Sequence, residues 1–331
     1  GGPELWEHGD RVERRAFFAE LRRAAPQQAR ELLAGSWKSE SGEDREAFLD
    51  ALVPGLSAED EPLLEAALDD RRKAVRERAA VLLVRLPDSA FARRMSGRAR
   101  AAVRLERRLL RSRLVVEPPA ELDASMVRDG ISAKAPAGTG PQAWWLRQIL
   151  AGTPLAVWGD LLGSPAGATA IPVDGTWRDV LLAGWIDATL RQRDREWARA
   201  LLATNAADVQ LPALVGLLEP GERAALVAGA VAGGATVPQQ VLTALLEACP
   251  APWPRPLVDA VLSRLAKPPG HPQDWLMREQ LSVVAHRLPP EAAAAVSAVA
   301  GQHPPDSPWA PALIRVAETL SFRRHMLEEL R

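Results

Sequence analysis

The pattern of apolar positions predicts helices along most of the chain. Apolar residues recur about every 3.6 positions, and the segments that they form end at Pro, Gly or Asp residues. A first helix is predicted over 10–23, with Asp10 as its N-cap, and a second over 26–33, which begins at a proline. A third is predicted over 43–53. The N-terminal part is therefore expected to consist of short helices.

The same pattern returns after residue 141, where most segments open at Pro or at an Asp or Ser cap. Helix pairs spaced by roughly 30 to 40 residues are typical of an α-solenoid, an array of stacked antiparallel helix pairs. Ile and Thr are scarce, which argues against a large sheet. The predicted fold class is all-α, with a packed helical bundle as the alternative to the solenoid. The later helices are predicted over 144–150, 154–162, 177–191, 195–203, 207–217, 221–232, 238–248, 256–266, 274–288, 291–301 and 308–331.

The most informative stretch begins at Ser57, which can cap a helix together with Asp60. A short apolar helix follows, then an Asp turn, and then a second helix over 74–86. This sequence of elements closely resembles a HEAT repeat. In that family the turn Asp and an Arg of the second helix form a ladder between neighbouring repeats. The resemblance implies this role for Asp70 and Arg76, and it makes the predicted solenoid HEAT-like.

A change of composition suggests how the chain is divided. Residues 114–141 are rich in Pro, Gly, Ala and Ser. A loop of this length is uncommon inside a compact unit and is often functional or a boundary. Three parts are therefore predicted: N-terminal HEAT-like repeats over 1–113, a linker or long loop over 114–141, and C-terminal helical repeats over 142–331.

The net charge is −1, but positive charge is concentrated in one region. A long basic helix is predicted from Asp88 to about Arg113, and six arginines fall on one of its faces. Such a stripe suits an acidic protein surface or a phosphate backbone. It is also consistent with a face that is only solvated, or that acidic residues of the chain neutralise. The six candidate partner-binding residues are Arg93, Arg100, Arg104, Arg107, Arg108 and Arg111.

Residues with catalytic or metal-binding spacing are not found in the sequence. Cys249 is the only cysteine, and none of the five histidines is spaced for a metal site with another His or Cys. No phosphate-binding loop or nucleophile motif occurs. We therefore expect no metal and no cofactor, and we predict a non-enzymatic binding scaffold. No apolar run reaches the ~18 residues of a membrane span, so a cytoplasmic protein is expected.

A tryptophan cluster offers a nucleic-acid alternative. HEAT-like alkylpurine DNA glycosylases use a concave basic solenoid with a stacking Trp and an Asp near the extruded nucleotide. Core packing is the competing interpretation, because the chain has no Tyr and few Phe to fill aromatic core positions. The residues concerned are Trp144, Trp145, Trp158, Trp177, Trp185 and Trp197, with Asp160, Asp179 and Asp187 near them in sequence.

The whole chain also resembles a bacterial family of unknown function with HEAT-like helical repeats. The resemblance rests on five runs: Leu64-Glu-Ala-Ala-Leu-Asp-Asp-Arg, Val75-Arg through Arg85-Leu-Pro, Trp144-Trp145, Glu196-Trp-Ala-Arg-Ala-Leu-Leu, and Phe322-Arg-Arg-His-Met-Leu. Members of that family resemble companions of operons that encode a MoxR-type AAA ATPase, a von Willebrand A-type protein and a SWIM zinc-finger protein. The resemblance implies a class of partner, for which the ATPase and the von Willebrand A-type protein are the candidates. The arginine stripe adds the expectation that this protein partner has an acidic surface.

Overall fold

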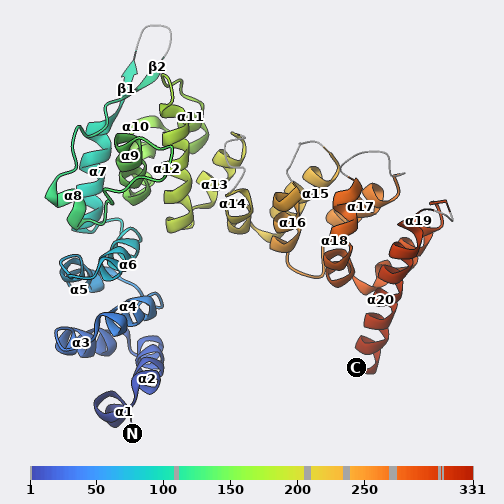
Figure 1. The fold of residues 1–331 in the computed structure, drawn as a ribbon, viewed down its shortest axis with the longest axis horizontal. Coiled ribbons are helices and arrows are strands. Elements are labelled where there is room, and N and C mark those ends of the chain that lie inside the picture. Colours follow the sequence, from blue (N-terminus) through green and yellow to red (C-terminus); the bar gives the residue numbers. More distant parts are fainter. Residues whose placement is uncertain are drawn as a thin grey trace. The chain divides into compact units, whose positions relative to one another are not determined.

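A computed structural model of the chain shows two compact units, Gly1–Leu201 and Leu202–Arg331, which are described separately below (Figure 1). Each unit is mostly α-helical. The coarse prediction of a mostly helical protein is therefore confirmed. The structure describes residues 2–107, 112–204, 210–233, 239–267, 274–304, 307 and 309–330.

The first unit contains helices, one 3-10 helix and a two-stranded sheet. In chain order its elements are α1 (Gly2–His8), α2 (Arg11–Ala24), α3 (Pro26–Ser36), α4 (Gly42–Ala51), η1 (Ala58–Asp60), α5 (Glu61–Ala67), α6 (Lys73–Leu83), α7 (Ala90–Ala102), β1 (Val103–Arg107), β2 (Ser112–Val116), α8 (Ala124–Arg128), α9 (Pro141–Gly152), α10 (Ala156–Leu162), α11 (Pro165–Ala170), α12 (Trp177–Gln192) and α13 (Arg195–Leu202).

The elements of the second unit are helical throughout its described residues. They are α14 (Leu211–Leu217), α15 (Pro220–Val231), α16 (Gln239–Ala248), α17 (Arg255–Leu265), α18 (Asp274–Arg287), η2 (Pro290–Ala292), α19 (Ala293–Ala300) and α20 (Trp309–Glu329).

Local capping explains where the N-terminal helices begin. Asp10 accepts hydrogen bonds from the backbone of α2, and the Glu13 side chain bonds back to the Asp10 backbone, which completes a capping box. The predicted pair of Ser57 and Asp60 also forms a capping box. Ser41 caps α4, so this helix starts one residue earlier than predicted. The three N-terminal helices and the Ser57 cap are thus confirmed.

Alternate helices pack against each other within each unit. In the first, α2 contacts α4 and α4 contacts α6, while α3 pairs with α2 and α5 with α6. In the second, one series of contacts links α14, α16, α18 and α20, and another links α15, α17 and α19. Helices two positions apart in the chain are therefore neighbours in space, as the ribbon shows for α2, α4 and α6 (Figure 1).

Helices α9 and α12 cross closely at Gly184. A Cβ atom there would lie 2.6 Å from the Cβ atom of Leu150. We expect Gly184→Ala to lower the free energy of unfolding by about 1 to 3 kcal/mol, because the helices must move apart. The matched control is Gly97→Ala in α7, whose added Cβ atom meets nothing within 4 Å. Alanine is the better helix former, so the control should be neutral or slightly stabilising. Urea denaturation measures both effects, and equal effects would contradict the close crossing.

The predicted long basic helix is wrong beyond Ala102. Helix α7 ends there, and the chain continues as β1, which pairs antiparallel with β2 in a register that places Val103 opposite Val116. Apolar residues alternate with charged ones along β1, and β-branched valines occupy both strands, which favours a strand. The backbone N–H of Leu114 also donates to the Pro172 carbonyl oxygen at 2.8 Å, which ties β2 to a later segment.

The segment 114–141 is packed against the rest of the first unit. It begins inside β2 and contains α8, and the side chains of Met126 and Ile131 within it are buried. The two compact units divide between Leu201 and Leu202.

Candidate functional site

An arginine contact recurs in the N-terminal helices. Arg14 donates from Nε to the Trp6 carbonyl oxygen at 2.9 Å and from Nη2 to a carboxylate oxygen of Glu40 at 2.7 Å. Its guanidinium carbon lies 4.6 Å from the centre of the Trp6 ring. The same arrangement returns at Arg45 and Trp37, each 31 positions later in the sequence. The same Trp–Arg contact therefore occurs twice in the N-terminal helices.

The acidic partner of Arg45 is Asp70, one of the two residues for which a ladder role was implied. Arg45 Nη1 donates to the Asp70 carboxylate at 2.6 Å, which joins α4 to the turn before α6. Arg76 does not bond this carboxylate. Its Nη1 donates to the carbonyl oxygens of Asp70 and Arg71, at 2.7 and 3.1 Å. Asp70 therefore links neighbouring helix pairs, whereas Arg76 closes its own turn.

Four of the six candidate partner-binding arginines lie in the described residues, and all four are exposed. Arg93 and Arg100 are on α7, and Arg104 and Arg107 are on β1. Residues three apart on a strand point to opposite faces, so Arg104 and Arg107 do not share the face that a helix would have given them. The remaining two, Arg108 and Arg111, lie outside the described residues. We call the four described arginines the basic surface.

Acidic residues of the chain neutralise part of the basic surface. Arg100 lies 3.6 Å from a carboxylate oxygen of Asp160, and Arg104 forms an ion pair with Glu117. Arg93 donates to a backbone carbonyl oxygen. Arg107 has no ion pair with any carboxylate in the part of the chain that the structure describes. Ion pairs between side chains this exposed contribute little and are readily exchanged for other partners.

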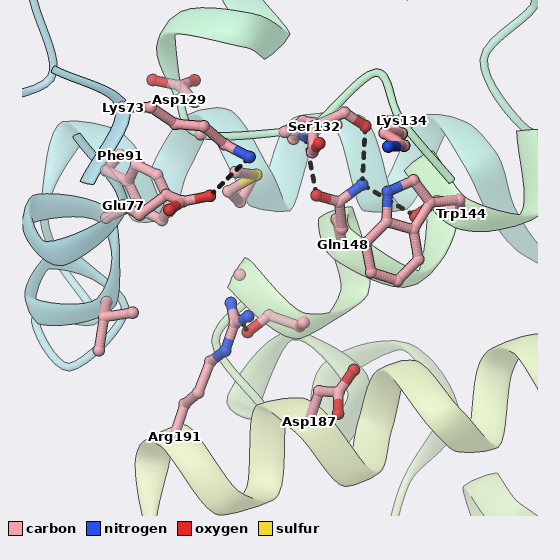
Figure 2. A pocket seen from close by; sticks show the side chains of 17 residues that line it. Lys73, Glu77, Phe91, Asp129, Ser132, Lys134, Trp144, Gln148, Asp187 and Arg191 are labelled. Carbon is pink, nitrogen blue, oxygen red and sulfur yellow. Dashed lines mark hydrogen bonds and ion pairs between the residues drawn. The ribbon is translucent and has the colours of Figure 1, made fainter. Parts of the chain in front are cut away.

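A cleft of about 420 Å³ opens in the first unit, where α6, α7, α9 and α12 meet the segment 129–134 (Figure 2). This volume falls within the range of pockets that hold small ligands or single side chains of a partner. Phe91 and Met95 of α7 and Ile131 contribute apolar wall, and all three side chains are otherwise buried. The cleft therefore combines apolar wall with the charged groups described next.

The Asp129 carboxylate is fully buried and has three cationic partners, since Arg128 Nη1 lies 3.6 Å from it in addition to Arg94 and Arg98. Arg94 donates to it from Nε at 2.9 Å and from Nη2 at 2.7 Å, and Arg98 donates from Nη1 at 2.7 Å. The hydrogen bonds that Arg94 donates to Asp129 chiefly, and those that it donates to Glu65, raise the pKa of Arg94 against the opposing effect of burial. These contacts attach the segment after α8 to α7. They also pair the Asp129 carboxylate with cations of the chain, so it is not available to bind a cationic ligand.

The other two carboxylates at the cleft are also paired. Arg147 donates from Nε to Asp187 at 2.7 Å and from Nη2 at 3.1 Å, which is bidentate geometry. Lys73 lies 3.4 Å from a carboxylate oxygen of Glu77, one turn further along α6. All three acidic residues of the cleft thus have a basic partner, and Figure 2 shows the pair of Lys73 and Glu77.

Lys134 and Arg191 are the remaining cations of the cleft, and both are exposed. Arg191 Nη1 makes a long hydrogen bond of 3.4 Å to the Ala151 carbonyl oxygen. Although the Arg191 side chain is accessible to solvent, the protein around the cleft partly desolvates it, which lowers the pKa of Arg191. Asp187 opposes this effect, and Arg147 adds to it. A guanidinium nevertheless stays protonated in proteins. The cleft therefore keeps positive charge that carboxylates of the described residues do not fully balance.

Polar groups also line the wall opposite Arg191. The Ser132 backbone N–H donates to Gln148 Oε1 at 2.8 Å, and Gln148 Nε2 donates to the carbonyl oxygens of Ser132 and Trp144. These bonds hold the segment 129–134 on α9. The indole Nε1 of Trp144 is buried and has no hydrogen-bond partner in the described structure. Trp145, Trp158, Trp185 and Trp253 have unpaired buried indole N–H groups as well, so this feature is not specific to the cleft.

Half of the tryptophan cluster is core. Trp158, Trp185 and Trp197 are buried, with ring centroids 5.7 Å apart for the first two and 5.5 Å apart for the last two. The core-packing interpretation is confirmed for these three. Trp144, Trp145 and Trp177 are half-buried. Of the Asp residues near the cluster, Asp160 contacts Arg100, Asp187 pairs with Arg147, and Asp179 is exposed.

No group of three or more His, Cys, Asp and Glu that could hold a metal ion occurs among the described residues. Cys249 is buried, and burial raises the pKa of its thiol, while Arg223 and Arg287 oppose that effect. His303 is buried and hydrogen-bonds the Leu265 carbonyl oxygen at 2.8 Å, while His271 lies outside the described residues. None of the helices described combines the length and the apolar composition needed to cross a membrane.

The cleft was not recognised in the sequence, because its residues come from five separate segments. One signal was present. Lys occurs at only four positions of the chain, and two of them, Lys73 and Lys134, line the cleft. In a sequence that otherwise uses Arg for positive charge, this enrichment marks the site.

One protein-family model, described as a family of unknown function (DUF5691), matches residues 1–330. The predicted resemblance to a family of unknown function is confirmed in this coarse form. No curated protein matches the chain, and no solved structure does.

Proposed function

We propose, from the premise that the chain belongs to the DUF5691 family of unknown function, that it is a non-enzymatic protein-interaction scaffold of the HEAT-like α-solenoid type. Its partner would be a protein with an acidic surface. The candidates are the MoxR-type AAA ATPase and the von Willebrand A-type protein that the sequence resemblance suggested, in the cytoplasm of a bacterium.

One observation carries this proposal: the Trp–Arg–acid contact that recurs after 31 residues. Arg14 and Arg45 each join their own helix to the acidic residue of the next turn, Glu40 and Asp70. A repeated contact of this kind is expected where each helix pair buries its apolar face only against its neighbours. Such an array offers a long surface for recognition and requires no catalytic groups, which supports a scaffold.

The basic surface is the proposed contact for the acidic partner. We expect the double reversal Arg104→Glu and Arg107→Glu to reduce co-purification of the partner about tenfold or more, because attraction becomes repulsion. The measurement is affinity capture of each candidate partner, co-expressed with the tagged chain. The matched control is Arg255→Glu, an arginine of α17 that is 91% exposed. Equal capture by the wild-type chain and by the double variant would remove the site assignment.

The nucleic-acid alternative, including a DNA glycosylase-like activity, has less support. Trp158, Trp185 and Trp197 pack on one another in the core, so they do not offer faces for stacking on a base. Duplex DNA nevertheless belongs in the same test, because Arg side chains suit phosphates as well as carboxylates.

A further inference from the structure

We propose that the cleft between α6, α7, α9 and α12 binds an acidic side chain, flanked by an apolar residue, from a segment of a partner protein. Lys134 and Arg191, the two cations that line the cleft and have no ion pair with a carboxylate of the described residues, are the candidates to bind the carboxylate. The inference rests on the proposed function only in making the occupant a protein segment. The site is separate from the basic surface, and it stands if that surface proves inert.

The charge balance of the cleft selects an anion. Each lining carboxylate already has a cation: Asp129 is paired with Arg94 and Arg98, Asp187 with Arg147, and Glu77 with Lys73. A cationic ligand would therefore have to displace existing partners and would meet Lys134 and Arg191. An anion displaces nothing, and a guanidinium and an ammonium together suit a carboxylate.

The apolar part of the cleft wall favours a ligand that carries an apolar group beside its anion. Phe91, Met95 and Ile131 line the same cleft and give an apolar flank to the charged groups. A volume of about 420 Å³ exceeds what a carboxylate alone fills, so an apolar neighbour of the acidic residue has a place to bury.

The test uses two dipeptides that differ by one group, N-acetyl-Leu-Glu-amide and N-acetyl-Leu-Gln-amide. Each is titrated into the isotopically labelled full chain, and the indole N–H resonance of Trp144 is followed by NMR. Loss of one resonance in Trp144→Phe identifies it. We expect a saturable shift with the Glu dipeptide and an affinity about tenfold lower for the Gln dipeptide, because only the former carries a carboxylate.

Two variants assign the cations. Lys134→Ala and Arg191→Ala should each weaken the Glu dipeptide about threefold or more, whereas Lys38→Ala, which removes an exposed lysine away from the cleft, should leave its affinity unchanged. All three replaced side chains are exposed, so the fold should persist. Equal affinities for the two dipeptides overturn the proposal, as does a Trp144 resonance that neither dipeptide moves. Equal weakening by Lys38→Ala and Lys134→Ala overturns it too.

The result is independent of partner capture. A chain that binds the Glu dipeptide but captures neither candidate partner retains the cleft site and loses the proposed partners. A chain that captures a partner through the basic surface but ignores the Glu dipeptide retains the scaffold and loses the cleft site.

Discussion

Replacing Arg22 with Ala is expected to lower the free energy of unfolding by about 3 to 5 kcal/mol, because it strands a buried carboxylate. Arg22 and Asp60 are both fully buried and form an ion pair with an N–O distance of 2.6 Å. The guanidinium also donates to the carbonyl oxygens of Leu52, Pro54 and Gly55, which close the turn after α4. Every N–H group of this side chain is therefore committed, and alanine leaves several buried acceptors unpaired.

Chemical denaturation measures this loss, and Arg23→Ala serves as control. Arg23 neighbours Arg22 in α2, but its side chain is 57% exposed and its ion pair with Glu20 lies on the surface. Its removal should change the unfolding free energy by less than about 1 kcal/mol. A comparable loss of unfolding free energy in the two variants would show that the buried ion pair of Arg22 and Asp60 stabilises the fold no more than a surface ion pair does.

The same ion pair makes stability depend on pH. Burial raises the pKa of Asp60, but hydrogen bonds from Arg22, from the Ser57 backbone and from Arg30 outweigh this effect, and the pKa lies below the usual range. A depressed folded-state pKa contributes stability above the unfolded-state value of about 3.9 and loses it as the pH falls through the folded-state value. The wild-type chain should therefore lose stability below about pH 4, and Arg22→Ala should show a smaller loss over that range.

Replacing Trp185 with Ala is the second large effect expected, again about 3 to 5 kcal/mol of unfolding free energy. Trp185 of α12 packs between Trp158 and Trp197, and alanine leaves a cavity that its neighbours cannot fill. Trp185→Phe keeps an aromatic ring and should cost less. Thermal or urea denaturation measures both variants. A Trp185→Ala chain with normal stability and impaired binding of single-stranded DNA would instead favour a stacking role, and with it the nucleic-acid alternative.

Local signals in the sequence accounted for much of the N-terminal half. Asp10, Ser57 and the proline at the start of α3 each act through their own backbone neighbours, so a single sequence suffices to place them. The Trp–Arg contact has an equally local signal in the sequence, because 31 residues separate Trp6 from Trp37 and Arg14 from Arg45.

The hairpin of β1 and β2 shows where a local sequence pattern fits both a helix and a strand. Arginines at 93, 100, 104 and 107 fit one face of a helix, yet Val103 to Arg107 also alternates with period two. Tertiary pairing decides between them, since β1 finds β2, and β2 in turn bonds the Pro172 carbonyl oxygen. A helical wheel considers one segment by itself, so it takes neither of these two pairings into account. The cleft is non-local in the same way, because it exists only once α6, α7, α9 and α12 surround the segment 129–134.

The most direct test of the central claim compares the two classes of partner on one chain. The wild-type chain and the Arg104→Glu, Arg107→Glu variant are titrated with the purified acidic partner and with duplex DNA over a series of salt concentrations. A scaffold for an acidic protein predicts salt-sensitive binding of the partner, its loss in the variant, and no DNA binding at low salt. Binding of DNA that weakens steeply with salt and is lost in the variant, with no binding of either protein partner, would contradict it.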